Sequence, residues 1–241
     1  SADPVFANWV QRNTQAHKMP GYRSVTISLK ATGIAPCDVT DDQLELLADL
    51  ADRFSFGELR TTHQQNMVLA DVRHSDLYAL WQALQPAGLA TANIGYLTDM
   101  ICCPGGDFCS LANAKSIPVA EAIQSRFDDM DYVYDLGPIE INISGCMNAC
   151  GHHHIGHIGV LGVDKKGQEF YQVSLGGSQA KDASIGKILG PSFSREAMPD
   201  VMDKLLSTYV DLRKEEETFL QTYQRVGVEP FKERVYASPA A

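Results

Sequence analysis

The spacing of hydrophobic residues in the first part of the chain predicts a small α+β unit. Residues 24–30, SVTISLK, alternate apolar and polar positions, as a half-buried strand does. Thr40 and Gln43 have the spacing of a capping box, and leucines and alanines follow at helical intervals, which predicts a helix. Residues 57–72 predict two strands around a polar turn, and residues 75–88 predict a second helix. This β-α-β-β-α order makes up most of a ferredoxin-like split βαβ unit.

The remainder of the chain has a different texture, in which glycine-rich turns separate short apolar runs. Its periodicity predicts a helix, three strands and a final helix, over residues 119–127, 139–145, 157–164, 169–177 and 201–213. The charged segment from residue 215 onward is expected to wrap back over the domain or to stay partly free.

These patterns predict three parts of the chain. Residues 1–20 are polar and end at Pro20-Gly21, so we expect an arm or linker without a core element. Residues 21–90 form the ferredoxin-like half-domain, and residues 91–241 form a second domain with a C-terminal tail. The expected fold class is therefore α+β.

Composition and charge exclude several classes of protein. The net charge of −10 argues against nucleic acid as the main partner, because phosphate binding requires a basic surface. No apolar run approaches the roughly 20 residues that span a bilayer, so no membrane partner is expected. The chain lacks a secretory signal pattern, which makes a cytoplasmic location the expectation, and its start at Ser1 suggests processing or cleavage from something longer.

The cysteines are the clearest chemical signal. Cys103 and Cys109 are separated by five residues, and Cys146 and Cys150 are separated by three. Four thiolates are what an iron–sulfur cubane needs, whereas zinc sites usually use tighter cysteine pairs. The spacing therefore favours an iron–sulfur cluster over zinc, with four buried and unreactive cysteines as a third interpretation.

Four segments together resemble a known family. CPGGDFCSLANA and SGCMNACGHHH resemble the cysteine signature of the sulfite and nitrite reductase hemoproteins. RTTHQQN, residues 60–66, is similar to the turn of that family that approaches its siroheme, and YQVSLGGS, residues 171–178, is similar to its LGG segment. The resemblance covers roughly residues 5–236 and is closest to the C-terminal half of assimilatory sulfite reductase hemoproteins. It implies a half ferredoxin-like module followed by an α/β siroheme/iron–sulfur module.

The resemblance gives the cysteines specific roles. It implies that Cys103, Cys109, Cys146 and Cys150 bind a [4Fe–4S] cluster, and that Cys150 also bridges to the iron of a siroheme. A shared sulfur would give electrons a short path, and a thiolate axial ligand enriches the iron in electron density. Cys102 is then the spare neighbour of Cys103, expected to be buried.

Further cofactor contacts are implied by the same resemblance. The candidates for binding siroheme, besides Cys150, are Arg60, Thr62, Gln65, Asn66, Asn148, Gly176 and Gly177. The guanidinium fork of arginine suits carboxylates, and glycine allows the backbone to approach a ligand closely. The alternatives are an ordinary polar hairpin turn for the first four, a turn asparagine, and a tight strand-end turn for the glycines.

The histidines after Cys150 are assigned a secondary part. The candidates for donating to siroheme carboxylates, or for contacting the metal ligands without binding the metal, are His152, His153, His154 and His157. A separate metal site is not favoured, because the segment is too short to place three imidazoles around a second ion without distorting the cysteine turn.

The implied activity is the reduction of sulfite to sulfide, with nitrite reduction to ammonia as the alternative. The implied partners are a ferredoxin or flavoprotein electron donor and an N-terminal half of the enzyme, or a separate chain, that supplies most of the Arg and Lys residues gripping the anion. An iron–sulfur electron-transfer protein without siroheme is the competing class, and a structural zinc protein is another.

Overall fold

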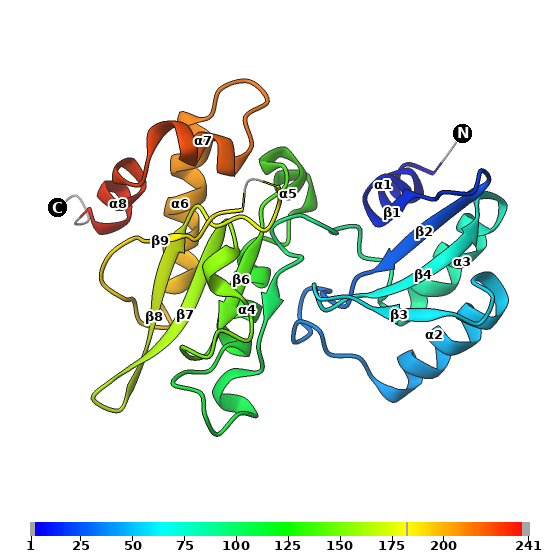
Figure 1. Cartoon of the computed structure of the whole chain (residues 1–241), viewed down its shortest axis with the longest axis horizontal. Coiled ribbons are helices and arrows are strands. Elements are labelled where there is room, and N and C mark those ends of the chain that lie inside the picture. Colours follow the sequence, from blue (N-terminus) through cyan, green and yellow to red (C-terminus); the bar gives the residue numbers. More distant parts are fainter. Residues whose placement is uncertain (1–2, 182, 238–241) are drawn as a thin grey trace. The chain divides into compact units, whose positions relative to one another are not determined.

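A computed structural model describes residues 3–181 and 183–237 of the chain. The chain divides into two compact units, Ser1–Gly95 and Tyr96–Ala241 (Figure 1). Each unit has its own hydrophobic core. The expected division was at residue 90. We call them the N-terminal unit and the C-terminal unit and describe each by itself.

The N-terminal unit has the predicted ferredoxin-like order. Its elements are α1 (Pro4–Asn13), β1 (Thr14–Ala16), β2 (Tyr22–Ile27), α2 (Asp41–Phe54), β3 (Leu59–Thr61), β4 (Met67–Arg73), the 3-10 turns η1 (His74–Asp76) and η2 (Gln85–Ala87), and between those turns α3 (Leu77–Leu84). The strands form an antiparallel sheet in the order β1-β2-β4-β3. The capping box of Thr40 and Gln43 forms at the start of α2, as predicted. Val25, Leu47, Leu69 and Leu80 meet in the fully buried core.

The structure differs from the expected arm over residues 1–20. Asp3 caps α1 by accepting the Val5 N–H, and the helix places Trp9 in the core with no exposed surface. Strand β1 extends the sheet by pairing with β2. The segment is polar overall, but Val5, Phe6, Trp9 and Val10 form one apolar stripe along it. Trp9 is buried in the core, and Phe6 and Val10 pack partly buried against it, which stabilises the helix.

The C-terminal unit is a sheet with helices. Its elements are β5 (Ile101–Cys102), η3 (Gly105–Asp107), α4 (Ile117–Arg126), α5 (Met130–Leu136), β6 (Ile141–Ser144), η4 (His153–Ile155), β7 (Ile158–Lys165), β8 (Gln168–Leu175), β9 (Lys187–Ile188), α6 (Met198–Leu212), α7 (Phe219–Val226) and α8 (Glu229–Tyr236). The strand order is β5-β6-β7-β8-β9, with β5, β6 and β7 parallel and the last two strands antiparallel. The α+β class expected from the sequence is confirmed.

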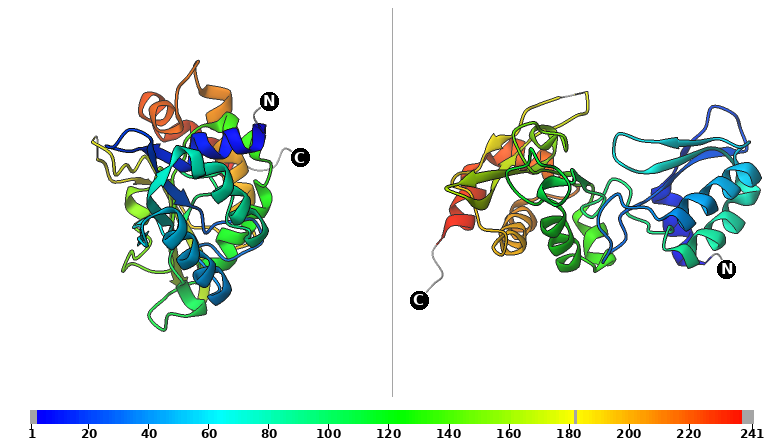
Figure 2. Two further views of the ribbon diagram at one scale, coloured as in Figure 1. Left: turned by 90° about the vertical axis from the view of Figure 1, so that its right-hand side faces the viewer. Right: turned by 90° about the horizontal axis from the view of Figure 1, so that it is seen from below.

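The two faces of this sheet differ in chemistry. Successive side chains of a strand point to opposite faces, so residues in cross-strand register share a face. Ile143, Val160 and Val173 are in register and belong to the buried core, together with residues of α4 and α6. Figure 2, right, shows α4 and α6 on one side of the strands. The neighbouring row of Asn142 and Ser174 therefore belongs to the other, polar face.

The segment after residue 215 packs into the core instead of staying free. Thr218 and Gln221 form a capping box at the start of α7, and Phe219 and Phe231 are fully buried. Short helices of this size are marginal alone, so packing against the core stabilises them.

Glu217 supplies a pH-dependent contact in this segment. A hydrogen bond from Arg225, followed by the Lys214 N–H, lowers the pKa of Glu217 to about 2. Because the ordinary value is 4.5, the contact stabilises the fold above about pH 4.5 and is lost as the pH falls toward about 2. We expect Glu217→Gln to speed amide hydrogen exchange in residues 214–226 at pH 7 relative to the parent chain, with a smaller difference near pH 3. Glu216→Gln, at the exposed neighbour, is the matched control, and equal effects of both changes would contradict the prediction.

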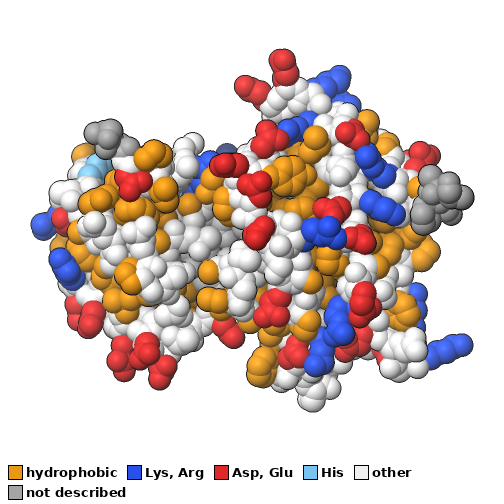
Figure 3. All heavy atoms as spheres, turned by 180° about the vertical axis from the view of Figure 1, so that it is seen from behind, with side chains coloured by type: hydrophobic (Ala, Val, Ile, Leu, Met, Phe, Trp, Pro, Cys, Tyr) orange, Lys and Arg blue, Asp and Glu red, His pale blue; other side chains and the backbone are white. Residues whose placement is uncertain are grey.

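Two observations relate to the expectations that the protein has no membrane partner and that nucleic acid is not its main partner. Over the described residues, no helix is long and apolar enough to cross a bilayer. On the face drawn in Figure 3, the described Lys and Arg side chains are scattered among Asp and Glu instead of forming one continuous basic surface.

Candidate functional site

The two cysteine pairs follow two adjacent parallel strands. Cys103 comes directly after β5, and Cys146 follows β6 with only Gly145 between them. Ile101 and Cys102 of β5 pair with Asn142 and Ile143 of β6. Because the carboxyl ends of parallel strands meet at one edge of a sheet, both cysteine loops begin at the same edge.

Backbone hydrogen bonds join these two loops. The Cys103 N–H donates to the Ile143 carbonyl over 3.0 Å, and the Gly145 N–H donates to Cys103 Sγ over 3.0 Å. The Asn113 and Ala114 N–H groups both donate to the Gly145 carbonyl, over 2.9 and 3.0 Å. The segment that follows Cys109 therefore returns to the loop of Cys146.

Glycine is needed where the loops touch. A Cβ at Gly145 would lie 2.7 Å from the Ala114 carbonyl oxygen, and a Cβ at Gly105 would lie 2.4 Å from the Ser116 nitrogen. Gly105 also has a φ of +58°, which L side chains rarely adopt. A larger side chain at Gly145 would push the two cysteine loops apart, and one at Gly105 would displace Ser116 within its own loop.

The four thiols range from buried to exposed. Cys103 and Cys146 are each 8% exposed, Cys109 is half-buried, and Cys150 is exposed. Three large apolar side chains within or beside these loops also face solvent: Phe108 at 80%, Leu111 at 71% and Met147 at 85%. Cys102 is buried, as expected for the spare neighbour, and its thiol donates to the Cys103 carbonyl.

The donor set fits an iron–sulfur cluster. The four thiols lie in loops from one sheet edge, and the Gly145 N–H already donates to a sulfur, as backbone groups do around such clusters. Across residues 3–181 and 183–237, no three His, Cys, Asp or Glu side chains are grouped so that they could hold one metal ion. A cluster does not need such convergence, because each of its irons takes a single thiolate.

Residues of the segment 28–37 hold the RTTHQQN turn of the N-terminal unit through hydrogen bonds. The Leu29 N–H donates to Asn66 Oδ1 over 3.2 Å, and the fully buried Lys30 ammonium donates to the Gln64 carbonyl. The Cys37 thiol donates to Gln65 Oε1 over 2.8 Å, and Cys37 and Gln65 both have positive φ, at 76° and 61°. No sequence pattern pointed to Lys30 or Cys37 as supports of this turn, since their contact with it is made only in the fold.

The four candidates in this turn differ in their surroundings. Arg60 is exposed and its Nε lies 2.5 Å from Glu58 Oε1. The Thr62 hydroxyl accepts the Asn66 N–H over 3.1 Å, so it closes the turn. Asn66 is only 2% exposed, and its side-chain oxygen is used inside the unit. Arg60 is therefore the best placed of the four to reach an external ligand.

Asn66 gives a stability prediction. Asn66→Ala removes the acceptor of a buried backbone N–H, which costs about 1–3 kcal/mol of unfolding free energy. The measurement is chemical denaturation of the full chain, followed by Trp fluorescence from the N-terminal unit, which holds Trp9 and Trp81. His63→Ala, at an exposed position of the same turn, should leave the midpoint nearly unchanged. An equal loss in the two variants would show that the Asn66 contact is not what holds the turn.

The candidates in the C-terminal unit also differ. Asn148 is exposed, between the two cysteines, and the left-handed backbone of that loop falls at Ala149 with φ 56°. A Cβ at Gly176 would lie 2.0 Å from the ring of Tyr223, and one at Gly177 would lie 2.5 Å from the Gly156 carbonyl oxygen. The close approaches that the structure shows at these two glycines are to protein groups.

The histidines after Cys150 separate into different environments. His152 is exposed with φ 52°, and His157 Nδ1 accepts the Glu140 N–H over 3.2 Å. His153 and His154 lie edge to face, with ring centroids 5.4 Å apart, beside a small cavity. Burial, with a smaller contribution from His154, lowers the pKa of His153 below its ordinary value.

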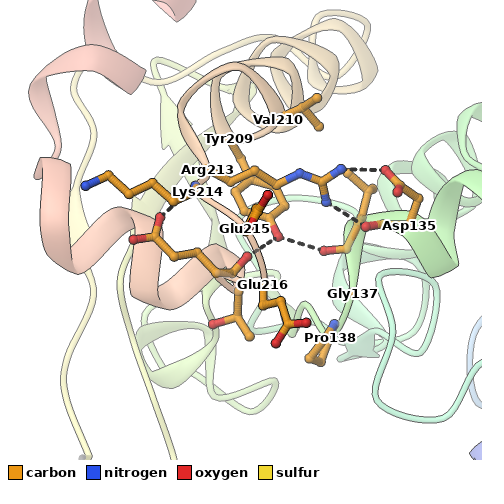
Figure 4. A pocket seen from close by; sticks show the side chains of 12 residues that line it. Asp135, Gly137, Pro138, Tyr209, Val210, Arg213, Lys214, Glu215 and Glu216 are labelled. Carbon is orange, nitrogen blue, oxygen red and sulfur yellow. Dashed lines mark hydrogen bonds and ion pairs between the residues drawn. The ribbon is translucent and has the colours of Figure 1, made fainter.

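A larger groove lies at the opposite end of the parallel strands. Figure 4 shows this groove of about 510 Å³, between the segment that precedes β6 and the loop from α6 to α7. Arg213 donates to the carboxylate and the carbonyl oxygen of Asp135, and the Tyr209 hydroxyl lies 2.9 Å from the Leu136 and Glu217 carbonyls. Its prominent polar groups thus already pair with one another, so the cysteine edge remains the candidate site.

Comparison with known proteins adds relatives of this fold. Residues 96–240 match the nitrite and sulphite reductase 4Fe-4S domain, and residues 16–87 match the nitrite/sulfite reductase ferredoxin-like half domain. A sulfite reductase [ferredoxin] of Mycobacterium tuberculosis is 30% identical over 83% of this chain and 38% of its own length. A ferredoxin–nitrite reductase of Synechococcus elongatus is 27% identical over 86% of this chain and 40% of its own length.

Solved structures agree with this relationship. The structure of the Mycobacterium tuberculosis NirA protein matches with a TM-score of 0.73 and 27% identity, over 91% of this chain and 41% of that one. Dissimilatory sulfite reductase I matches with the same TM-score at 14% identity, which supports the fold alone. The chain spans about two fifths of the length of the curated relatives that it matches. With both domain models covering it in order, the chain belongs to the nitrite and sulphite reductase family.

Proposed function

We propose that this chain is the siroheme- and [4Fe–4S]-binding half of a sulfite reductase that reduces sulfite to sulfide. The observation that carries the proposal is the meeting of both cysteine loops at the carboxyl edge of β5 and β6. In this proposal Cys103, Cys109, Cys146 and Cys150 hold the cluster, and Cys150 is also shared with the siroheme iron. Its exposure supports that second role, because an outward thiol is open to another ligand.

The protein's part in the site is to hold these thiolates and to donate to them. The Gly145 N–H to Cys103 Sγ bond stabilises negative charge on that sulfur, which favours the reduced state of a bound cluster. Bound cluster and siroheme would supply the stepwise electron transfer that the reduction of sulfite requires. The exposed Phe108 and Met147 would be shielded from water by whatever binds beside the thiols.

The polar turn of the N-terminal unit would bind the carboxylates of the siroheme. Arg60 has an exposed ion pair with Glu58, and such pairs contribute little, so its guanidinium can exchange that partner for a cofactor carboxylate. Gln65 lies in the turn with a left-handed backbone, and its side-chain oxygen accepts the Cys37 thiol. In this proposal its amide group would donate to a cofactor carboxylate. Thr62 and Asn66 would hold the turn, and Asn148, Gly176 and Gly177 complete the proposed contacts.

The partners follow from the length and the names of the relatives. Relatives named sulfite reductase [ferredoxin] and ferredoxin–nitrite reductase support a ferredoxin as electron donor, with a flavoprotein as the alternative. An N-terminal half, or a partner chain, would supply most of the positive groups around the anion, since preorganised charge is what such a pocket provides.

Nitrite reduction to ammonia is the second candidate function, and it is favoured by the matches to ferredoxin–nitrite reductases. Turnover of sulfite and of nitrite by the complete reductase, under the same electron donor, separates the two. A higher kcat/KM for nitrite would overturn the sulfite assignment.

One set of measurements tests the cofactors. We expect the full chain, reconstituted anaerobically with iron and sulfide, to bind close to four irons and four labile sulfides and to show a broad iron–sulfur absorbance. Added siroheme should then give tetrapyrrole bands that change more on Cys150→Ser than on Cys109→Ser, because both variants lose a cluster ligand and only the first loses the shared thiolate. Zinc without labile sulfide would overturn the cluster assignment, and siroheme bands unaffected by Cys150→Ser would overturn the bridging role.

A further inference from the structure

The polar face of the C-terminal sheet carries a cavity outside the cysteine site. It has a volume of about 190 Å³ and lies between η4 and the strands β7, β8 and β9. Its polar lining comes from His153, His154, Gln172 and Ser174, and its apolar lining from Leu161 and Ile188.

Two buried polar atoms at this cavity have no hydrogen-bond partner among the residues that the structure describes. Ser174 is 8% exposed, and its hydroxyl makes no hydrogen bond. His153 Nδ1 is also buried and makes none. An unpaired buried polar atom destabilises the fold, and buried polar groups in folded proteins are usually satisfied. Two of them at one cavity indicate that a polar ligand belongs there.

The walls of the cavity are fixed by backbone contacts. Gly159 of β7 lies in register with Ser174, and a Cβ there would lie 2.0 Å from the His153 carbonyl oxygen and 2.5 Å from Ser174 Oγ. The absence of a side chain at Gly159 thus lets η4 lie directly on the sheet. On the other side, the Gly186 N–H donates to the His154 carbonyl over 2.8 Å. The two unpaired groups are therefore held in place before any ligand binds.

The lining favours a ligand with anionic oxygens. Among the described residues that line the cavity there is no Asp or Glu, so these residues do not repel a negative group. The imidazole N–H, the serine hydroxyl and the glutamine amide can each donate a hydrogen bond to an oxygen. The volume of the cavity is several times the roughly 30 Å³ that one water occupies in the liquid. The cavity therefore has room for a small oxyanion.

We propose that this cavity binds a small oxygen anion, either a carboxylate group or an inorganic oxyanion such as sulfite, through His153, Ser174 and Gln172. The site is distinct from the four thiols and does not depend on a bound cluster. Both sources present the same chemistry, a compact group of oxygens that accepts hydrogen bonds from uncharged donors.

Calorimetric titration of the full chain tests the proposal. Sodium sulfite, sodium nitrite and sodium acetate are titrated at constant ionic strength, with sodium chloride as the reference. We expect saturable binding of at least one oxyanion with a stoichiometry near one, and an affinity at least tenfold weaker in Ser174→Ala. Stronger binding of acetate identifies a carboxylate as the natural group, and stronger binding of sulfite or nitrite identifies a free oxyanion.

The controls separate this site from the proposed substrate site. Ser207→Ala, on α6 and outside the cavity, should bind as the parent chain does, and removal of iron should leave the affinity unchanged. Gln172→Met gives a second test at the rim if Ser174→Ala disturbs the sheet. No saturable binding beyond that of chloride would mean that the cavity holds ordered water only. That result, binding lost on removal of iron, or unchanged affinity in both cavity variants would overturn the proposal.

Discussion

Cys103→Ala is expected to abolish assembly of the iron–sulfur cluster, whereas Cys102→Ala is expected to leave it nearly intact. The two thiols are adjacent in the chain and both are buried, so composition and burial do not distinguish them. Cys103 Sγ receives the Gly145 N–H from the loop that carries Cys146, and Cys102 Sγ instead donates to a carbonyl of its own segment. The Cys103 sulfur therefore takes part in joining the two loops.

Iron and labile sulfide per chain after anaerobic reconstitution are the readouts. We expect at least a tenfold loss of bound sulfide in Cys103→Ala, since a cubane lacking one thiolate has one iron without a protein ligand. Far-ultraviolet circular dichroism of both variants controls for folding. Full cluster content in Cys103→Ala, or equal loss in the two variants, would mean that the ligand at this corner of the site has been misassigned.

The choice between Cys102 and Cys103 came from spacing, and the structure supplies a physical reason for it. Cys102 is the last residue of β5 and belongs to the core cluster, so its side chain is committed to packing. Cys103 is the first residue beyond the strand, where the chain leaves the sheet edge. The periodicity of the strands and the cysteine pattern are local properties, and for that reason the ferredoxin-like order and the two cysteine loops were predictable.

The parts that were not predictable depend on contacts between distant segments. Trp9 forms part of the core only because α1 packs against α3, with Phe6 beside Trp81, and a polar segment gives little sign of this. The space that a side chain at Gly176 would take is filled by the ring of Tyr223, which comes from far along the chain and leaves no local signal in the sequence. The four histidines look alike in sequence, and only the fold separates His153, against a cavity, from His157, which accepts a backbone N–H.

The contrast between local patterns and distant contacts also holds at the cysteine site. The residue types that donate to a cluster are fixed by chemistry and stand out in the sequence. The residues that hold these ligands, such as Gly145 and Ser116, are ordinary loop residues in the sequence. They matter because the Gly145 N–H lies 3.0 Å and the Ser116 hydroxyl 3.5 Å from Cys103 Sγ. Variants of these supporting residues should therefore report on the geometry of the site without removing a ligand.

Gly151 provides the sharpest test of that geometry. A Cβ at this position would lie 2.0 Å from the Ile143 carbonyl oxygen, which is backbone and part of strand β6. Gly151→Ala must therefore displace the turn that carries Cys150, and overpacking of this kind typically costs about 1–3 kcal/mol. We expect both a lower midpoint of thermal unfolding and a severalfold loss of cluster, although all four thiols remain.

Gly106→Ala is the matched control within the other cysteine loop. A Cβ there would meet its nearest neighbours at 3.4 Å, where a small shift relieves the contact. This variant should retain most of the cluster and unfold within a few degrees of the parent chain. If Gly151→Ala bound a full cluster, the turn of Cys150 would have to tolerate displacement from Ile143, and the close packing of that loop on β6 would not be what positions the thiol. If instead Gly151→Ala lost the cluster while its unfolding midpoint stayed unchanged, the effect would lie in the position of Cys150 alone.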